Sequence, residues 1–253
     1  MNFQKNWKII FGLIMIILSI TFYVIHYLIF KDLHHIFIYL LGDIAFVFIE
    51  VLLVSIIIHN LLNEWEKRSH LKKLNMVIET FFSEFGKYLL AFISKHDKNL
   101  DKIKDKITSS EECGEINFSN AINIIKKYNE NIDINKIDLQ TLLIFLKDKR
   151  KFLLNLLQNP NLLEHESFSE TLMSIFHITE ELAARDLKNL SLEDLNHTKT
   201  DIERAYKNLT IQWLNYMNYT KKNYPYFYLF AMKTNPFDEK SKWLNDWEQI
   251  YTT

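Results

Sequence analysis

The chain opens with two apolar stretches that are each long enough to cross the hydrocarbon core of a membrane. Residues 9–30 contain no Asp, Glu, Lys or Arg, and a helix of that length extends about 33 Å. A second such stretch, residues 36–58, follows after the short link 31–35. A cleaved signal peptide has a shorter apolar core and a small-residue cleavage site, and neither is present. The sequence therefore predicts a transmembrane helical hairpin over residues 1–62.

Basic residues flank the predicted hairpin asymmetrically. Lys5 and Lys8 precede the first span, four basic residues lie between Lys67 and Lys73, and the link contains only Lys31. Because Lys and Arg remain on the cytoplasmic side of a bilayer, both termini are expected in the cytoplasm. The predicted location is the cell (inner) membrane, as a multi-pass protein whose link faces outward.

The second span carries two acidic residues, Asp43 and Glu50, within its apolar run. Charged and central, they would oppose insertion by roughly 5 to 7 kcal/mol. Their seven-residue spacing places both on one helix face, and Gly12, Ser19 and His26 repeat at the same interval in the first span. In a tight antiparallel hairpin, His26 would lie at the depth of Asp43, and Ser19 at that of Glu50. The two faces are therefore expected to meet each other or a shared oligomer axis.

Three interpretations of this intramembrane group remain open. The polar residues can hold the hairpin or a homo-oligomer together by hydrogen bonds. They can form an acidic ring around a cation path in an oligomer. They can also relay protons through His26 and the two carboxylates. The candidate site residues are Asp43, Glu50, His26 and Ser19, and we expect a homo-oligomer that assembles through the hairpin.

The rest of the chain reads as helix. It has few helix breakers, since the whole sequence holds 4 Gly and 3 Pro, and no alternating run predicts a strand. We expect a juxtamembrane helix over 63–95 that continues the second span, a polar connector or loop over 96–117, and a helical cytoplasmic domain over 118–253. The fold class is therefore all-α. The helices of the domain are expected over residues 118–129, 138–158, 167–190 and 192–224, with capping boxes at Ser167/Glu170 and Ser191/Asp194 and a short helix in the tail after Pro236.

Histidines with neighbouring carboxylates are the candidates for a metal site. They occur at Glu164-His165-Glu166, at His177 with Glu180 and Glu181, and at a lone His197. Helical spacing can bring two ligands to one ion. However, His177 and Glu181 project away from the apolar stripe of their helix, which indicates a solvated face, and the Glu-x-x-His motif of di-iron bundles is missing at both helical histidines. We therefore expect no metal and no cofactor.

Signatures of catalysis and of nucleic-acid binding are also missing. The sequence has no G-x-S-x-G, no G-x-x-x-x-G-K-[ST] and no G-x-G-x-x-G. Its one cysteine, Cys113, lies among glutamates, which disfavour a reactive thiolate. A net charge of -1 gives no electrostatic footprint for nucleic acid, and the aromatic run 224–230 is assigned to packing. We expect neither an enzyme nor a nucleic-acid partner.

Several phrases of the sequence resemble one family. They are HHIFIYLLGDIAFVFIEVLLVSIIIH, KKLNMVIETFFSEFG, NPNLLEHESFSETL, HITEELAAR and YPYFYLFAMKTNPFD. Together they extend over most of residues 34–238, and they are similar to an uncharacterised prokaryotic family of two-span membrane proteins. The resemblance implies an architecture, a hairpin followed by a helical cytoplasmic domain, and implies no activity, ligand or catalytic residue.

Two functions fit these expectations. The first is a membrane-anchored, non-enzymatic sensor or scaffold, whose cytoplasmic helical domain binds a protein partner while the hairpin holds it at the lipid bilayer. The second is an oligomeric pore-forming or ion-conducting effector of the toxin or defence type, with Asp43 and Glu50 lining the path; that step is an analogy of architecture.

The orientation can be tested by cysteine labelling in a Cys113→Ser background. A cysteine in place of His34 is expected to react with an impermeant thiol reagent added outside intact cells, whereas one in place of Lys98 is expected to react only after lysis. The reverse pattern would contradict the orientation.

Overall fold

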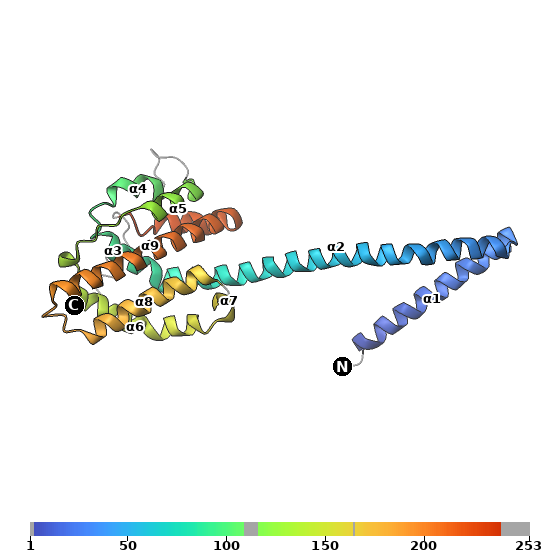
Figure 1. Ribbon diagram of the computed structural model, residues 1–253, viewed down its shortest axis with the longest axis horizontal. Helices are drawn as coiled ribbons and strands as arrows, with labels where there is room; N and C mark the ends of the chain where they lie inside the picture. The colour runs from blue at the N-terminus through green and yellow to red at the C-terminus, as the bar shows by residue number, and fades with distance from the viewer. Residues whose placement is uncertain (1–2, 109–115, 164, 239–253) are drawn as a thin grey trace. The chain divides into compact units, whose positions relative to one another are not determined.

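The computed structural model describes residues 3–108, 116–163 and 165–238, and these form two compact units that divide between Lys67 and Arg68. The all-α prediction is confirmed. Across the described ranges the backbone forms helices and no strand, apart from one isolated bridge between Asp97 and Ile132. Figure 1 shows the helices in chain order.

The N-terminal unit consists of α1 (Phe3–Phe30) and the first part of α2 (Leu33–Phe81). The link between them is short because both helix ends are capped locally. Lys31 adopts a positive φ of 50°, a left-handed conformation typical of helix C-termini. The Asp32 carboxylate then accepts hydrogen bonds from the backbone N–H of His34 at 2.9 Å and of His35 at 3.3 Å, as an N-cap does.

Both helices of this unit are long and apolar enough to cross a membrane. The first candidate span is Ile9–Phe30 and the second lies in the helix that begins at Leu33, each with a mean hydropathy of 2.5. None of either apolar window is buried within the chain. Their large aliphatic and aromatic side chains therefore need an apolar surrounding other than this chain's own core.

The second unit, hereafter the helical domain, begins within α2. It continues through a π-helical turn, η1 (Phe82–Gly86), and further helices. These are α3 (Lys87–Ser94), α4 (Asp101–Ile107), α5 (Phe118–Lys127), the 3-10 turn η2 (Ile134–Lys136), α6 (Leu139–Leu157), α7 (Pro160–Leu163), α8 (Glu166–Ala184), α9 (Leu192–Asn223) and α10 (Pro225–Lys233).

Aromatic side chains at the end of α2 and in η1 form the centre of the domain's core. Phe81, Phe82 and Phe85 are at most 1% exposed. The Phe85 ring stacks on Phe145 of α6 with ring centroids 5.1 Å apart, and the Phe82 ring meets Trp213 of α9 at 5.2 Å. Phe85 lies four positions after Phe81 and three after Phe82, so the three rings share one broad face of the helix. The end of α2 is thus buried among α6 and α9.

Helix α9 packs along both α8 and α5, and α8 also packs on α6 (Figure 1). The beginning of α9 follows its sequence signal, since the Ser191 hydroxyl accepts a hydrogen bond from the Asp194 N–H at 3.1 Å. The prediction of a capping box at Ser167 and Glu170 is wrong. Helix α8 begins after His165, whose Nδ1 accepts a hydrogen bond from the Phe168 N–H at 3.3 Å.

Residues 96–117, expected to form a polar loop, instead contain helix α4. Its Ile103 and Ile107 are 4% and 1% exposed, so the apolar side of this polar helix belongs to the core. Asp97 fixes the entry to the segment, because its carboxylate accepts hydrogen bonds from the Tyr128 hydroxyl at 2.6 Å and the Asn131 N–H at 3.2 Å. Two isoleucines four positions apart are too weak a periodic signal to outweigh the polar composition. Cys113 and the expected helix in the tail lie outside the described residues.

Over residues 63–95, where a juxtamembrane helix is expected to continue the second span, the structure has the end of α2, then η1 and α3. The second half of this range, from Leu74 to Ser94, contributes buried residues to the same core as α6, α8 and α9. The division between the two units lies inside α2, after Lys67.

The close packing at the π-turn can be tested with Gly86→Ala. A Cβ at residue 86 would lie 2.6 Å from ring carbons of both Phe81 and Phe82, and these rings are fully buried. We expect a net loss of about 1–3 kcal/mol in the free energy of unfolding, even though alanine favours a helix interior by about 1 kcal/mol. Chemical denaturation followed by circular dichroism of the aromatic side chains measures this loss.

The control for this experiment is Gly42→Ala in α2, where an added Cβ meets nothing within 4 Å. This variant should not lower the stability of the helical domain. Equal stability of the Gly86→Ala variant and the wild type would contradict the packing.

Candidate functional site

The polar residues of the two candidate spans, singled out in the sequence, are not brought together within one chain. Ser19, Asp43 and Glu50 are exposed. None of these three side chains forms a hydrogen bond or an ion pair in the described part of the chain. His26 contacts neighbours at the turn instead. Its ring lies 5.9 Å from that of His35 and 4.8 Å from that of Phe30. No contact of His26 with Asp43 is present within the described chain, and the meeting of the two polar faces at an oligomer axis stays a prediction.

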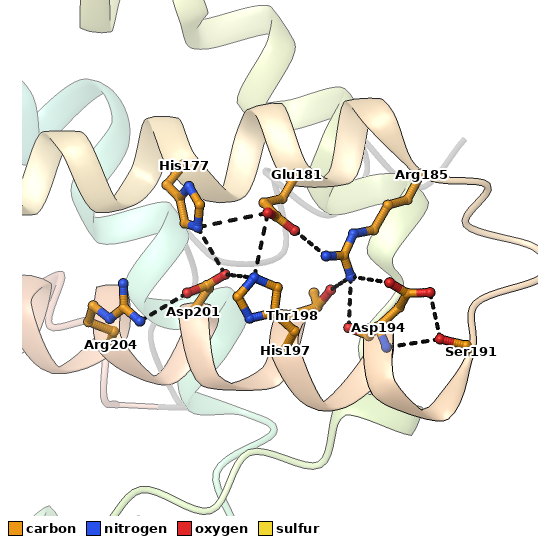
Figure 2. A network of polar contacts seen from close by, with 9 residues as sticks. All are labelled: His177, Glu181, Arg185, Ser191, Asp194, His197, Thr198, Asp201 and Arg204. Carbon is orange, nitrogen blue, oxygen red and sulfur yellow. Dashed lines mark hydrogen bonds and ion pairs between the residues drawn. The ribbon is translucent and has the colours of Figure 1, made fainter.

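The polar group that the structure does bring together lies between α8 and α9. It comprises His177 and Glu181 of α8 with His197 and Asp201 of α9, hereafter the α8–α9 cluster. On each helix the two residues are four positions apart, so they share a face. Antiparallel packing sets the two faces opposite each other, and Figure 2 shows all four side chains converging.

The imidazole nitrogens and carboxylate oxygens of this cluster are close in every direction. Across the helices, His177 Nε2 lies 3.3 Å from Asp201 Oδ2, and His197 Nε2 lies 3.5 Å from Glu181 Oε1. Along each helix the separations are 3.9 Å in α8 and 3.6 Å in α9. One donor atom from each of the four residues lies within 4.8 Å of the others.

Two arginines hold the carboxylate oxygens that point away from the centre. Arg185 Nη2 lies 2.5 Å from Glu181 Oε2, and Arg204 Nη2 lies 3.2 Å from Asp201 Oδ1 (Figure 2). Each carboxylate therefore presents one oxygen to the histidines and the other to a guanidinium. Such contacts fix the rotamer of a carboxylate and the direction of its remaining lone pairs.

Arg185 also connects the cluster to the beginning of α9. It donates a hydrogen bond to the Asp194 carbonyl oxygen at 3.0 Å and forms an ion pair with the Asp194 carboxylate at 3.0 Å. The hydrogen bond from Ser191 and the charge of Arg185 hold the pKa of Asp194 below its usual value. Asp194 therefore stays ionised and keeps Arg185 in place.

The cluster has the composition of a cation site. Imidazole nitrogen and carboxylate oxygen are ligands of divalent transition metals, and two of each from two helices can surround one ion. His177 and His197 are each about half exposed, at 47% and 48% of the side chain, whereas Asp201 is 2% exposed. The cluster is therefore open to solvent on the histidine side and closed beneath Asp201.

Sequence reasoning assigned His177 and Glu181 to a solvated face and treated His197 as isolated. The available signal was the pair of i, i+4 motifs, His-x-x-x-Glu on one helix and His-x-x-x-Asp on the next. The sequence pattern does not determine the rotation of α9 about its axis, and this rotation turns His197 and Asp201 toward α8. In the third grouping, His165 caps α8 and Glu166 begins it, and Glu164 lies outside the described residues.

A second feature of the domain is an exposed aromatic face on α10. Tyr226, Phe227 and Phe230 are 88%, 57% and 64% exposed, and Leu229 is 58% exposed. The aromatic run was expected to pack in the core, and this expectation is wrong for most of it. Within α10 only Ala231 is buried, while Tyr228 and Met232 pack partly against the core.

The aromatic face continues onto α2. A small pocket of about 190 Å³ is lined by Lys72 and Met76 of α2 together with Tyr224 and Phe227. Met76 is itself 51% exposed. We refer to Met76, Tyr226, Phe227, Leu229 and Phe230 as the α10 surface. Exposed apolar patches of this kind mark interaction sites on soluble domains.

Comparisons with known proteins divide the chain in the same way as the structure. Residues 2–62 match the family model described as the N-terminal helical domain of MJ1433, and residues 70–233 match the model of the C-terminal helical domain of uncharacterized protein MJ1433. Over 239 residues the chain is 46% identical to the uncharacterized protein MJ1433 of Methanocaldococcus jannaschii, covering 94% of this chain and 96% of that protein. No solved structure matches the chain.

Proposed function

The chain belongs to the uncharacterised MJ1433 family of proteins with N- and C-terminal helical domains, and we propose that it is a membrane-anchored, non-enzymatic sensor or scaffold protein. The N-terminal unit anchors it in the lipid bilayer, and the helical domain binds a protein partner in the cytoplasm. The observation that carries the proposal is the α10 surface.

The α10 surface supports binding rather than further folding of the domain. The domain already has a continuous core, from Leu74 in α2 to Phe237 after α10. Leaving four large side chains of one short helix in water is unfavourable, at about 25 cal/mol per Å² of apolar area. A partner that covers them recovers this free energy, and aromatic side chains are enriched at the centres of interfaces.

The charges around the surface indicate the chemistry of the partner. Lys221 and Lys222 precede the aromatic residues in the sequence, and Lys233 follows them. Lys72 lines the adjoining pocket. The Lys221 ammonium lies 5.9 Å from the centre of the Tyr228 ring. The complementary partner is a protein segment with apolar side chains to cover the aromatics and carboxylates to meet the lysines.

The proposal is tested by photo-crosslinking with the full chain in its native membranes. A benzophenone amino acid in place of Tyr226 is expected to give a discrete adduct with another protein. The adduct should be lost when Lys222→Glu and Phe230→Ser are added, because these changes remove the charge match and an apolar contact. The matched control is the same amino acid in place of Leu192, which is 81% exposed and lies outside the α10 surface; it should give no such adduct.

Three outcomes would contradict the proposal. An adduct of twice the chain mass would assign the surface to a second copy of the chain, and adducts with lipid alone would assign it to the bilayer. Absence of any adduct at residue 226 would remove the surface as a binding site.

An oligomeric, ion-conducting membrane effector is the second candidate function. It is supported by the exposure of Asp43 and Glu50 on one face of the apolar part of α2 without a partner in the described chain. In a bilayer, such carboxylates require protonation, protein partners or water. A ring of chains with both residues facing a central path supplies the last two.

The measurement for this candidate is ion flux in liposomes, with wild type and Glu50→Gln compared at equal oligomer content. If Glu50 lines a cation path, flux should fall in Glu50→Gln while the oligomer persists; Glu66→Gln, beyond the apolar stretch, is the control and should conduct like the wild type. Absence of flux from the wild type would leave Asp43 and Glu50 with a role in association alone.

A further inference from the structure

We propose that the α8–α9 cluster binds one divalent transition-metal ion, with Zn²⁺ as the reference case. The ligands are Nε2 of His177, Nε2 of His197, Oε1 of Glu181 and Oδ2 of Asp201. The proposal goes beyond the anchoring and partner-binding role and does not depend on it, because it rests only on side chains within the helical domain.

The spacing of the four atoms already approximates a coordination shell. With metal–ligand bonds of about 2.1 Å, two ligands of a tetrahedral ion lie about 3.4 Å apart. The four histidine–carboxylate separations are 3.3, 3.5, 3.6 and 3.9 Å. Binding a tetrahedral ion therefore requires movements of a few tenths of an ångström along these four edges, while the histidine–histidine and carboxylate–carboxylate edges, each at most 4.8 Å, close by at most about 1.4 Å. Such movements are within the reach of side-chain torsions alone.

Asp201 supplies an independent reason to expect a cation. Its side chain is 2% exposed, yet neither carboxylate oxygen accepts a hydrogen bond from the described residues. Its contacts are ion-pair separations to the two imidazoles and to Arg204. A buried carboxylate without hydrogen bonds is costly, and an ion at the centre of the cluster satisfies the oxygen that faces the histidines.

The arginines fit the role of outer-shell partners. Metal-bound carboxylates in proteins are commonly oriented by a second contact on the oxygen that does not bind the ion. Arg185 provides this contact for Glu181, and Arg204 provides it for Asp201. The network contains three carboxylates and two guanidinium groups, so it has one negative charge in excess, apart from its histidines. The carboxylates are those of Glu181, Asp194 and Asp201. The network therefore favours a cation at its centre.

The donor set selects the class of metal. Two imidazoles exclude a preference for Ca²⁺ or Mg²⁺, which bind oxygen donors, and the cluster contains no thiolate. The exposed side formed by His177 and His197 leaves room for water as an additional ligand. The expected ions are Zn²⁺ and its neighbours Co²⁺ and Ni²⁺. The alternative is that no metal binds and that the cluster consists only of ion pairs between the histidines and the carboxylates.

The experiment uses the full chain in detergent, stripped with a chelator and dialysed. Titration with Co²⁺ is expected to give visible d–d absorption that saturates at one ion per chain and is displaced by Zn²⁺. Zn²⁺ alone should raise the melting temperature of the helical domain. The variants His197→Ala and Glu181→Gln should each weaken Co²⁺ binding by more than the roughly 10- to 100-fold loss typical of an outer-shell change.

The matched control is Glu180→Gln. Glu180 is the neighbour of Glu181, is 62% exposed and forms an ion pair with Arg150 at 3.0 Å, away from the cluster; its variant should bind Co²⁺ like the wild type. The melting temperature of each metal-free variant shows that it is folded. The proposal is overturned if the wild type shows no saturable binding, or if folded His197→Ala and Glu181→Gln bind as tightly as Glu180→Gln. The first result would assign the cluster to ion pairs alone.

Discussion

The structure depends on one helix, α2, meeting opposite solvation requirements along its length. Its first part is largely apolar and unburied and is long enough to cross a membrane, although it carries Asp43 and Glu50. Its end is buried on the inward face only, with Phe81 and Phe82 at the centre of the helical domain.

The π-turn η1 follows Phe81 within this buried region. Phe85 lies four positions after Phe81 and three after Phe82, so the three rings share one broad helix face that meets the core. Gly86 is required at this point, since the rings of Phe81 and Phe82 occupy the place where a Cβ would lie. The three phenylalanine rings contact Phe168 of α8, Trp213 of α9 and Phe145 of α6.

The same packing creates the α8–α9 cluster. Apolar residues of α8 and α9 turn toward the core, and the side chains next to that apolar stripe then meet at its edge. His177 meets Asp201, and His197 meets Glu181, because the helices are antiparallel and each carries its pair at i, i+4. Arg185 and Asp194 lie at the adjoining ends of α8 and α9 and hold them in register. The cluster is therefore a consequence of how the core packs.

The sequence by itself determined the helical class, the two candidate spans and the approximate bounds of the long helices, because each follows from local periodicity, chain breakers and caps such as Ser191. It also identified Asp43 and Glu50 as costly in a membrane, since that cost depends on composition alone. Only the tertiary structure decided that Ile103 and Ile107 are core residues, that Phe230 is exposed, and that His177, Glu181, His197 and Asp201 converge. These outcomes depend on the rotation of each helix about its axis, which is set by contacts between segments far apart in the sequence.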